Sequence, residues 1–300
     1  MRIQKRYWFG LAALALIGLS VFFSLPPCEP IVNNHPLGYW LENNFGNNLE
    51  DSSAEFQKAL PAIDDRCIPA LIEELKWSPS PMLRSAEKFN MKWVHGRLSI
   101  HEPKDLRFGA ALVLGSLGPR ASNAIPTLEN LSQSHDVDNE TSYTQRGAAI
   151  AALILIRRDS MDVCARKSLD MLDPDKYDYQ CAIVSLGTNA TSTIPIFVNA
   201  LQATTNSVVR YTASRALGWI HSRPDLSLPP LISMLRETNT VSRSQGADAL
   251  VRFRDTAKPA WNDLVPLLND PDETVRFFTK NALQAIDPAA AEQLGIDSFQ

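Results

Sequence analysis

Several features that mark particular protein classes are scarce or missing in this chain of 300 residues. Glycine is low, at 13 residues, and no run of alternating β-branched residues indicates a half-buried strand. The 29 lysines and arginines are outnumbered by 33 acidic residues, and the net charge of −4 gives no overall electrostatic footprint for nucleic acid. The four cysteines form no Cys-x-x-Cys pair, so a zinc site or a haem attachment has no support. These cysteines are Cys28, Cys67, Cys164 and Cys181.

Catalytic motifs are missing as well. The sequence has no Gly-x-Ser-x-Gly nucleophile elbow, no phosphate-binding glycine loop and no His-Glu-x-x-His zinc motif. Paired acids such as Asp64 and Asp65 are common on exposed helix faces. We therefore expect no catalytic residue, no metal ligand and no cofactor.

The feature that is present is a repeat. A small or compact residue follows each of five arginines after three positions, a leucine after seven, and an apolar residue after ten. These offsets lie on one face of an α-helix. A fixed period of about 20–50 residues is the mark of a repeat architecture, and the last three arginines are spaced at 33 residues. The five are Arg107, Arg146, Arg210, Arg243 and Arg276.

A second helix precedes each arginine helix. Short apolar segments with an early proline begin at Ile125, Ile194 and Leu228, and proline is tolerated in the first helical turn. A polar turn follows, as at residues 269–274, where Pro271 and Asp272 end one helix and cap the next. Such helix hairpins cannot bury their apolar faces alone. The sequence therefore predicts an all-α solenoid of about six to seven stacked hairpins.

The repeated pattern resembles a known family. Its order is Ile-Pro-x-Leu, an Asp-rich turn, then Val-Arg-x-x-Ala and Ala-Leu-x-x-Ile, clearest at residues 193–220 and 261–286. This order is similar to the short HEAT-like repeats of phycobilin lyases, and the resemblance covers roughly residues 60–290. The signatures of tetratricopeptide and ankyrin repeats are absent. The resemblance implies the fold but little about function, since this family spans scaffolds, lyases and adaptors.

One unit departs from the pattern. Between Arg146 and Arg210 the arginine position falls near Tyr179, and we interpret residues 168–188 as a degenerate repeat. In an exported protein Cys164 and Cys181 could bridge its two helices, and the alternative is that each is a small buried residue. A weaker copy is expected at residues 37–63, with Phe56, Leu60 and Ile63 as its inner stripe.

The N-terminus carries a second signal. Three basic residues precede an uncharged stretch from Tyr7 to Leu25, which is just long enough to cross a bilayer as a helix. We expect a membrane anchor. A signal peptide cleaved after Ser20 and a lipoprotein at Cys28 are the alternatives, although the proline directly before Cys28 argues against the second.

The charges around this stretch predict its orientation and the domain order. No lysine or arginine follows it until Lys58, so the N-terminus is expected in the cytoplasm and the solenoid outside, with a secreted or periplasmic protein as the alternative after cleavage. We expect the anchor over residues 1–25, a stalk over 26–53 with a weak helix near Trp40, a solenoid over 54–294 and a tail over 295–300.

An insertion at residues 78–104, which the other units lack, is a candidate docking element. Its middle is predicted to be an amphipathic helix with a basic face, in an otherwise acidic chain. Insertions on one side of a repeat array often mark the binding side. Packing of this helix on the solenoid is the alternative. The candidate partner-binding residues are Arg84, Lys88, Lys92, Trp93 and Arg97.

Two classes of function remain from the sequence. The first is a membrane-tethered, non-enzymatic scaffold that binds another protein, and the second is an accessory or lyase-type enzyme component that acts on a cofactor-bearing protein. The repeated arginines could form a charged binding ridge or a structural ladder. We expect the ladder, in which each arginine ties its helix to a polar turn.

Overall fold

The computed structural model describes residues 30–42, 48–50, 52–76, 103–134 and 141–296. Two expectations lie outside these residues. The anchor from Tyr7 to Leu25 is one of them, and the insertion, of which only its last two residues are described, is the other.

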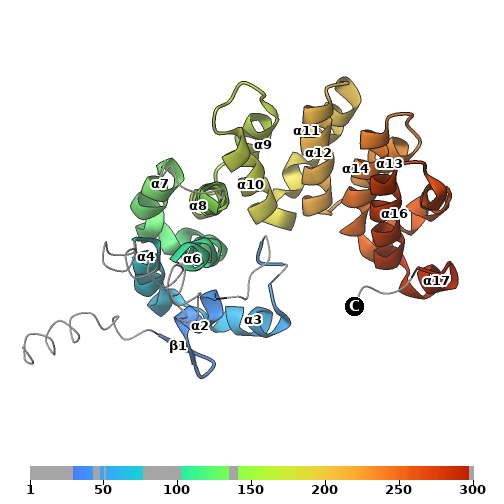
Figure 1. Ribbon diagram of the computed structural model, residues 1–300. Helices are drawn as coiled ribbons and strands as arrows, with labels where there is room; N and C mark the ends of the chain where they lie inside the picture. Colours follow the sequence, from blue (N-terminus) through green and yellow to red (C-terminus); the bar gives the residue numbers. More distant parts are fainter. Residues whose placement is uncertain (1–29, 43–47, 51, 77–102, 135–140, 297–300) are drawn as a thin grey trace, which may run out of the picture.

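Helices pair into hairpins, and the hairpins stack into an arch (Figure 1). Each inner helix packs against the inner helix of the next hairpin along the whole array. The prediction of an all-α solenoid is therefore confirmed for the repeat array in the described residues. The outer helices are α4 (Ile68–Lys76), α7 (Ile125–Gln133), α9 (Met161–Leu169), α11 (Ile194–Ala203), α13 (Pro224–Leu235) and the short α15 (Trp261–Leu264). The inner helices are α6 (Pro103–Leu117), α8 (Thr141–Arg157), α10 (Lys176–Leu186), α12 (Ser207–Ile220), α14 (Thr240–Val251) and α16 (Glu273–Ile286).

Short 3-10 helices connect the larger ones. After α6, α10 and α14 the chain turns through a residue with positive φ, namely Gly118 at 59°, Gly187 at 51° and Arg254 at 49°. Glycine adopts this conformation without steric cost. The connecting helices are η1 (Leu60–Ala62), η2 (Asp65–Cys67), η3 (Gly118–Ala124), η4 (Gly187–Thr193), η5 (Arg254–Ala260) and η6 (Val265–Asn269), and the chain continues into α17 (Pro288–Gln293).

The predicted inner stripe is buried at every position. This holds for the residues three, seven and ten positions after each of the five arginines, so the helical periodicity correctly identified the core. The stripe consists of Ala110, Ala149, Ala213, Gly246 and Thr279; Leu114, Leu153, Leu217, Leu250 and Leu283; and Leu117, Ile156, Ile220, Phe253 and Ile286.

The turns cap the inner helices as predicted, but one outer helix begins early. The Asp272 carboxylate accepts hydrogen bonds from the amides of Thr274 and Val275 at the start of α16. Helix α13, expected to begin at Leu228, begins at Pro224 instead. Proline is tolerated at this first helical position, as it is in the first turn of α7 and α11. A hydrogen bond from the Ser227 hydroxyl to the Ser222 carbonyl supports the added turn.

The segment before the solenoid is folded rather than a free stalk. Strand β1 (Ile31–Val32) pairs antiparallel with β2 (His35–Pro36), and α2 (Leu37–Leu41) follows. Leu37, Trp40 and Leu41 are buried against the first units, and the Trp40 indole donates to the Val32 carbonyl at 2.9 Å. The weak helix predicted near Trp40 is present as α2, and it packs on the array rather than standing free of it as part of a stalk. The weak copy at residues 37–63 contains two short helices, α2 and α3 (Ala54–Ala59), with Phe56 and Ile63 buried.

One stretch of the described residues, Lys176–Ala203, is long and apolar enough to cross a membrane by composition alone. Half of its most apolar window is buried inside the protein. The stretch is also divided into α10, η4 and α11, with a left-handed turn at Gly187. Its apolar side chains therefore form part of the core of the repeat array.

Cys164 lies on α9 and Cys181 on α10, and both are free cysteines, so the bridge is not present. The Cys164 thiol donates to the Tyr179 carbonyl at 3.7 Å. Burial raises the pKa of Cys164 to about 12 and also raises the pKa of Cys181. Cys164 is buried and Cys181 is half-buried, and the raised pKa values indicate small packed side chains rather than reactive thiols.

Candidate functional site

The repeated arginines lie where consecutive turns of the array meet. Arg243 illustrates the arrangement. Its Nη1 donates to the carbonyls of Glu237 at 3.0 Å and Thr238 at 2.8 Å, in the turn of its own unit. Its Nε and Nη2 donate to the two carboxylate oxygens of Asp270, in the turn of the next unit, at 2.7 and 3.0 Å. One guanidinium therefore joins two turns.

Asp270 is the acceptor of this bidentate contact and is only 7% exposed. Its carboxylate also accepts from the Asp272 amide at 3.0 Å. The hydrogen bond from Arg243 is the main cause that lowers the pKa of Asp270, and burial opposes it. The same contact raises the pKa of Arg243.

Arg146 and Arg210 make contacts of both kinds, and Arg276 makes the first kind. Carbonyls at or just after the end of the preceding outer helix accept from Arg146, Arg210 and Arg276 at 3.1, 2.7 and 2.7 Å. Arg146 also pairs with Asp178 at 2.9 Å, and Arg210 pairs with Glu237. Asp178 and Glu237 belong to the following unit, so both pairs connect neighbouring hairpins.

In the degenerate unit a glutamine makes the corresponding contacts. Gln180 Nε2 donates to the Ser168 carbonyl at 3.2 Å and to the Thr212 hydroxyl oxygen at 3.1 Å. The polar position therefore lies one residue after Tyr179, the residue expected from the spacing. A cavity of about 280 Å³ remains here between α10 and α12, lined in part by Cys181 and Arg215.

We call the surface that the inner helices form on the inside of the arch the inner face. Over α12, α14 and α16 it contains a cavity of about 790 Å³. The Arg252 guanidinium stacks on the Trp219 ring in this cavity. His221, with φ 32°, ends α12 and lines the same space. Desolvation by the surrounding side chains raises the pKa of Asp248. The positive charges of Arg252 and Arg215 partly offset this rise.

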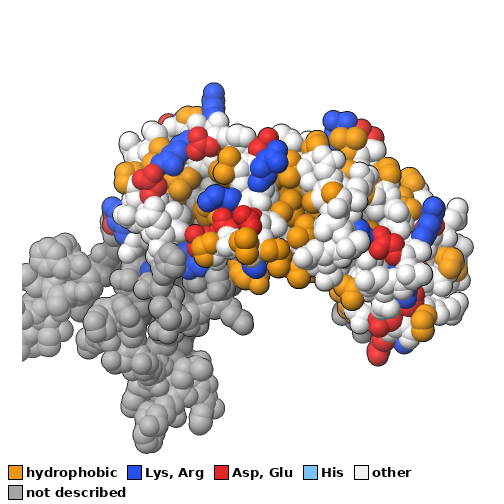
Figure 2. Space-filling view, turned by 90° about the horizontal axis from the view of Figure 1, so that it is seen from above, with side chains coloured by type: hydrophobic (Ala, Val, Ile, Leu, Met, Phe, Trp, Pro, Cys, Tyr) orange, Lys and Arg blue, Asp and Glu red, His pale blue; other side chains and the backbone are white. Residues whose placement is uncertain are grey.

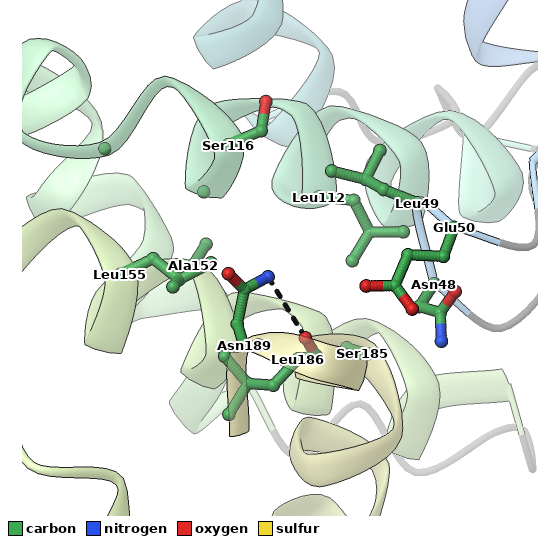
Figure 3. Close-up of a pocket in the computed structure, with 13 residues that line it drawn as sticks. Asn48, Leu49, Glu50, Leu112, Ser116, Ala152, Leu155, Ser185, Leu186 and Asn189 are labelled. Carbon is green, nitrogen blue, oxygen red and sulfur yellow. Dashed lines mark hydrogen bonds between the residues drawn. The ribbon is translucent and has the colours of Figure 1, made fainter. Parts of the chain in front are cut away.

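A second cavity, of about 320 Å³, lies over α6, α8 and α10. Its walls include the apolar side chains of Leu112, Ala152 and Leu155 (Figure 3). Residues 48–50, which we call the strap, form one end of it, and Asn48 and Glu50 also line the larger cavity. The strap therefore lies between the two cavities of the inner face.

Sequence reasoning did not identify these inner-face residues. A signal existed for Trp219 and Arg252, because each lies nine positions after a repeated arginine, Arg210 and Arg243. No repeated spacing could have identified the strap, whose contacts on α10 and η4 are more than 130 residues away in the sequence.

The predicted partner-binding residues of the insertion, Arg84 to Arg97, lie outside the described residues. Among the residues that the structure describes, no group of three His, Cys, Asp or Glu side chains could hold a metal ion. Figure 2 shows lysines and arginines beside aspartates and glutamates on the face turned to the viewer, with apolar patches between them. The two signs of charge are interspersed on this face.

Comparisons with known proteins give a family match over part of the array. No curated protein matches the chain. A solved structure titled "Crystal Structure of Engineered Protein" is similar over 80% of this chain, with 20% identity and a TM-score of 0.34, and the match spans 64% of that structure's chain. Residues 165–251 match the family model of HEAT repeats. This range runs from within α9 to the last residue of α14. This part of the array is therefore similar to HEAT repeats.

Proposed function

We propose that this protein is a non-enzymatic scaffold, tethered to a membrane, whose inner face binds another protein. HEAT repeats generally serve as protein-interaction scaffolds, and the curvature of a solenoid creates an extended concave surface for a partner. The observation that carries the proposal is the inner face itself. It combines apolar walls around Leu155 with a stacked Trp219–Arg252 pair, and aromatic and arginine side chains are the residues that anchor protein interfaces.

The lyase-type alternative has less support. The larger cavity does bring Trp219, His221 and Asp248 to one side of the arch, which the sequence spacing did not indicate. However, His221 Nδ1 lies 2.9 Å from the Trp219 carbonyl and has the contact of a helix-end residue.

Site-directed photo-crosslinking tests the scaffold. A crosslinking residue in place of Asp248, on the inner face, should give an adduct of defined mass in native membranes. The matched control is Asn199, an exposed residue on the outer helix α11, which should give no such adduct. Equal adducts from both positions, or none from Asp248, would contradict binding through the inner face.

The tether rests on the stretch from Tyr7 to Leu25. We expect the full-length protein to remain with membranes after high-salt and carbonate washes, with the solenoid accessible to protease only from the extracytoplasmic side. Recovery of the protein in the wash, or a mature N-terminus at Val21, would replace the anchor with a peripheral or secreted form. The basic residues Arg84, Lys88 and Lys92 are proposed as an additional contact, for an acidic partner or the membrane surface.

A further inference from the structure

The strap makes specific polar contacts with the middle of the inner face. Asn48 is 2% exposed, and its Nδ2 donates to the Val184 carbonyl at 3.2 Å. Glu50 Oε1 accepts from the Thr188 amide at 3.3 Å and from the Thr188 hydroxyl. Glu50 Oε2 lies 3.7 Å from His221 Nε2. Two side chains of this short bent segment therefore meet one carbonyl acceptor and the two donors of Thr188.

The backbone of the array is shaped to receive these side chains. Helix α10 ends at Gly187, where the last carbonyls of a helix and the first amides of the next one lack the partners of a helix interior. Gly187 has a φ of 51°, and a Cβ built there would lie 3.1 Å from Asn48 Nδ2 and 3.2 Å from Glu50 Oε2. The missing side chain thus leaves space for the strap.

The strap covers only part of the inner face. The cavity of about 320 Å³ continues from it along α6, α8 and α10, and that of about 790 Å³ continues along α12 to α16. Figure 3 shows Asn48, Leu49 and Glu50 at one end of the smaller cavity, with Leu155 and Ala152 at the other. The larger cavity is lined by Arg252, whose guanidinium covers the ring of the buried Trp219. A longer segment than the strap could therefore extend in both directions.

We propose that the strap is an intramolecular ligand, and that the inner face binds a carboxylate-bearing peptide segment of a partner protein in its place. The chemistry of the occupant follows from the groups that Glu50 contacts, the Thr188 amide and hydroxyl, which donate to an oxygen anion. The partner segment displaces Glu50 from these donors and adds apolar contacts in the smaller cavity. This inference rests on the proposed scaffold function and names the chemistry of its ligand.

A synthetic peptide tests the exchange directly. The probe is a fluorescein-labelled peptide of residues 46–53, Gly-Asn-Asn-Leu-Glu-Asp-Ser-Ser, added to the purified full-length chain in detergent. In an unlatched variant with Asn48→Ala and Glu50→Ala, the peptide should bind saturably and at least about tenfold more tightly than to the parent chain. The parent strap competes at the high effective concentration of a tethered ligand. Equal binding to the parent and the variant would overturn the proposal.

Two matched controls locate the interaction. A peptide with glutamine in place of Glu50 should bind the unlatched variant at least about fivefold more weakly, since it lacks the charge that strengthens the bonds from Thr188. Introducing Thr188→Val into the unlatched variant should weaken binding of the glutamate peptide to the same level. Equal affinity of the two peptides would show that no carboxylate is recognised.

Further measurements distinguish a wrong strap proposal from a variant that does not fold and from a wrong scaffold proposal. If the unlatched variant loses its helical circular dichroism signal, Glu50→Gln alone replaces it and should raise the affinity for the glutamate peptide severalfold. If the peptide fails to bind while position 248 still crosslinks a partner, the strap proposal is wrong and the scaffold function stands. If neither is observed, both proposals are wrong.

Discussion

Replacing Asp270 by asparagine should lower the free energy of unfolding by about 3 kcal/mol, because it removes the charge that a buried guanidinium needs. The side chains of Arg243 and Asp270 are 12% and 5% exposed, and two hydrogen bonds of 2.7 and 3.0 Å join them. Asparagine can accept only one of these bonds and carries no charge. Urea denaturation followed by circular dichroism measures the loss.

The chain offers a matched control for this substitution. Arg236 and Asp263 form another bidentate pair across the same sequence distance of 27 residues, but the Arg236 side chain is 68% exposed. Exposed pairs contribute about 0–1 kcal/mol. Asp263→Asn should therefore cost far less than Asp270→Asn. Equal losses would contradict the view that burial makes the Arg243–Asp270 pair structural.

The pH dependence of the same pair has a defined sign. Arg243 lowers the pKa of Asp270 in the folded state below its ordinary value of 3.8. A lowered folded-state pKa means that the pair stabilises the protein fully above the unfolded pKa. The contribution is lost as the pH falls through the lower, folded value. The stability difference between the parent and Asp270→Asn should therefore be constant near neutral pH and shrink below about pH 4.

The repeated part of the fold was predictable because its physical requirements recur in every unit. Each inner helix needs a small residue where it crosses its neighbour and a branched apolar residue in the core, and each turn needs a donor for its last carbonyls. Ala213, Leu217 and Arg210 satisfy these requirements in one unit, and their counterparts satisfy them in the others. Repetition makes such local requirements visible in a single sequence.

Features that occur once were not predictable in the same way. The polar contact of the degenerate unit comes from Gln180 rather than Tyr179, because an amide at the next position reaches the turn of α9 and the hydroxyl of Thr212. The strap depends on contacts with Val184 and Thr188 that are 136 and 138 residues distant in the sequence. Nothing local to Asn48 or Glu50 indicates such a partner, so this part of the inner face required the structure.

Replacing Gly147 by alanine should destabilise the protein by about 2–3 kcal/mol, although alanine is the better helix former. Gly147 lies on α8, where α10 approaches most closely. A Cβ built on it would lie 2.4 Å from the Cys181 Cβ, 2.9 Å from the Ala182 nitrogen and 2.9 Å from the Asp178 carbonyl oxygen. Two of these atoms belong to the backbone of α10. The helices must therefore separate, and this cost exceeds the gain of about 1 kcal/mol in helix propensity.

Gly115 provides the graded control for this substitution, since its Cβ would meet Ala152 Cα at 3.1 Å and a flexible leucine methyl at 3.3 Å. Gly115→Ala should be close to neutral. Adding Cys181→Gly to Gly147→Ala should restore only part of the loss of stability, because the backbone contacts of α10 remain.

Separation of α8 and α10 also strains the 2.9 Å pair between Arg146 and Asp178, which joins the same two helices. Combining Gly147→Ala with Asp178→Asn should therefore cost less than the sum of the two single changes. Strict additivity would mean that α8 and α10 accommodate the methyl group without moving apart.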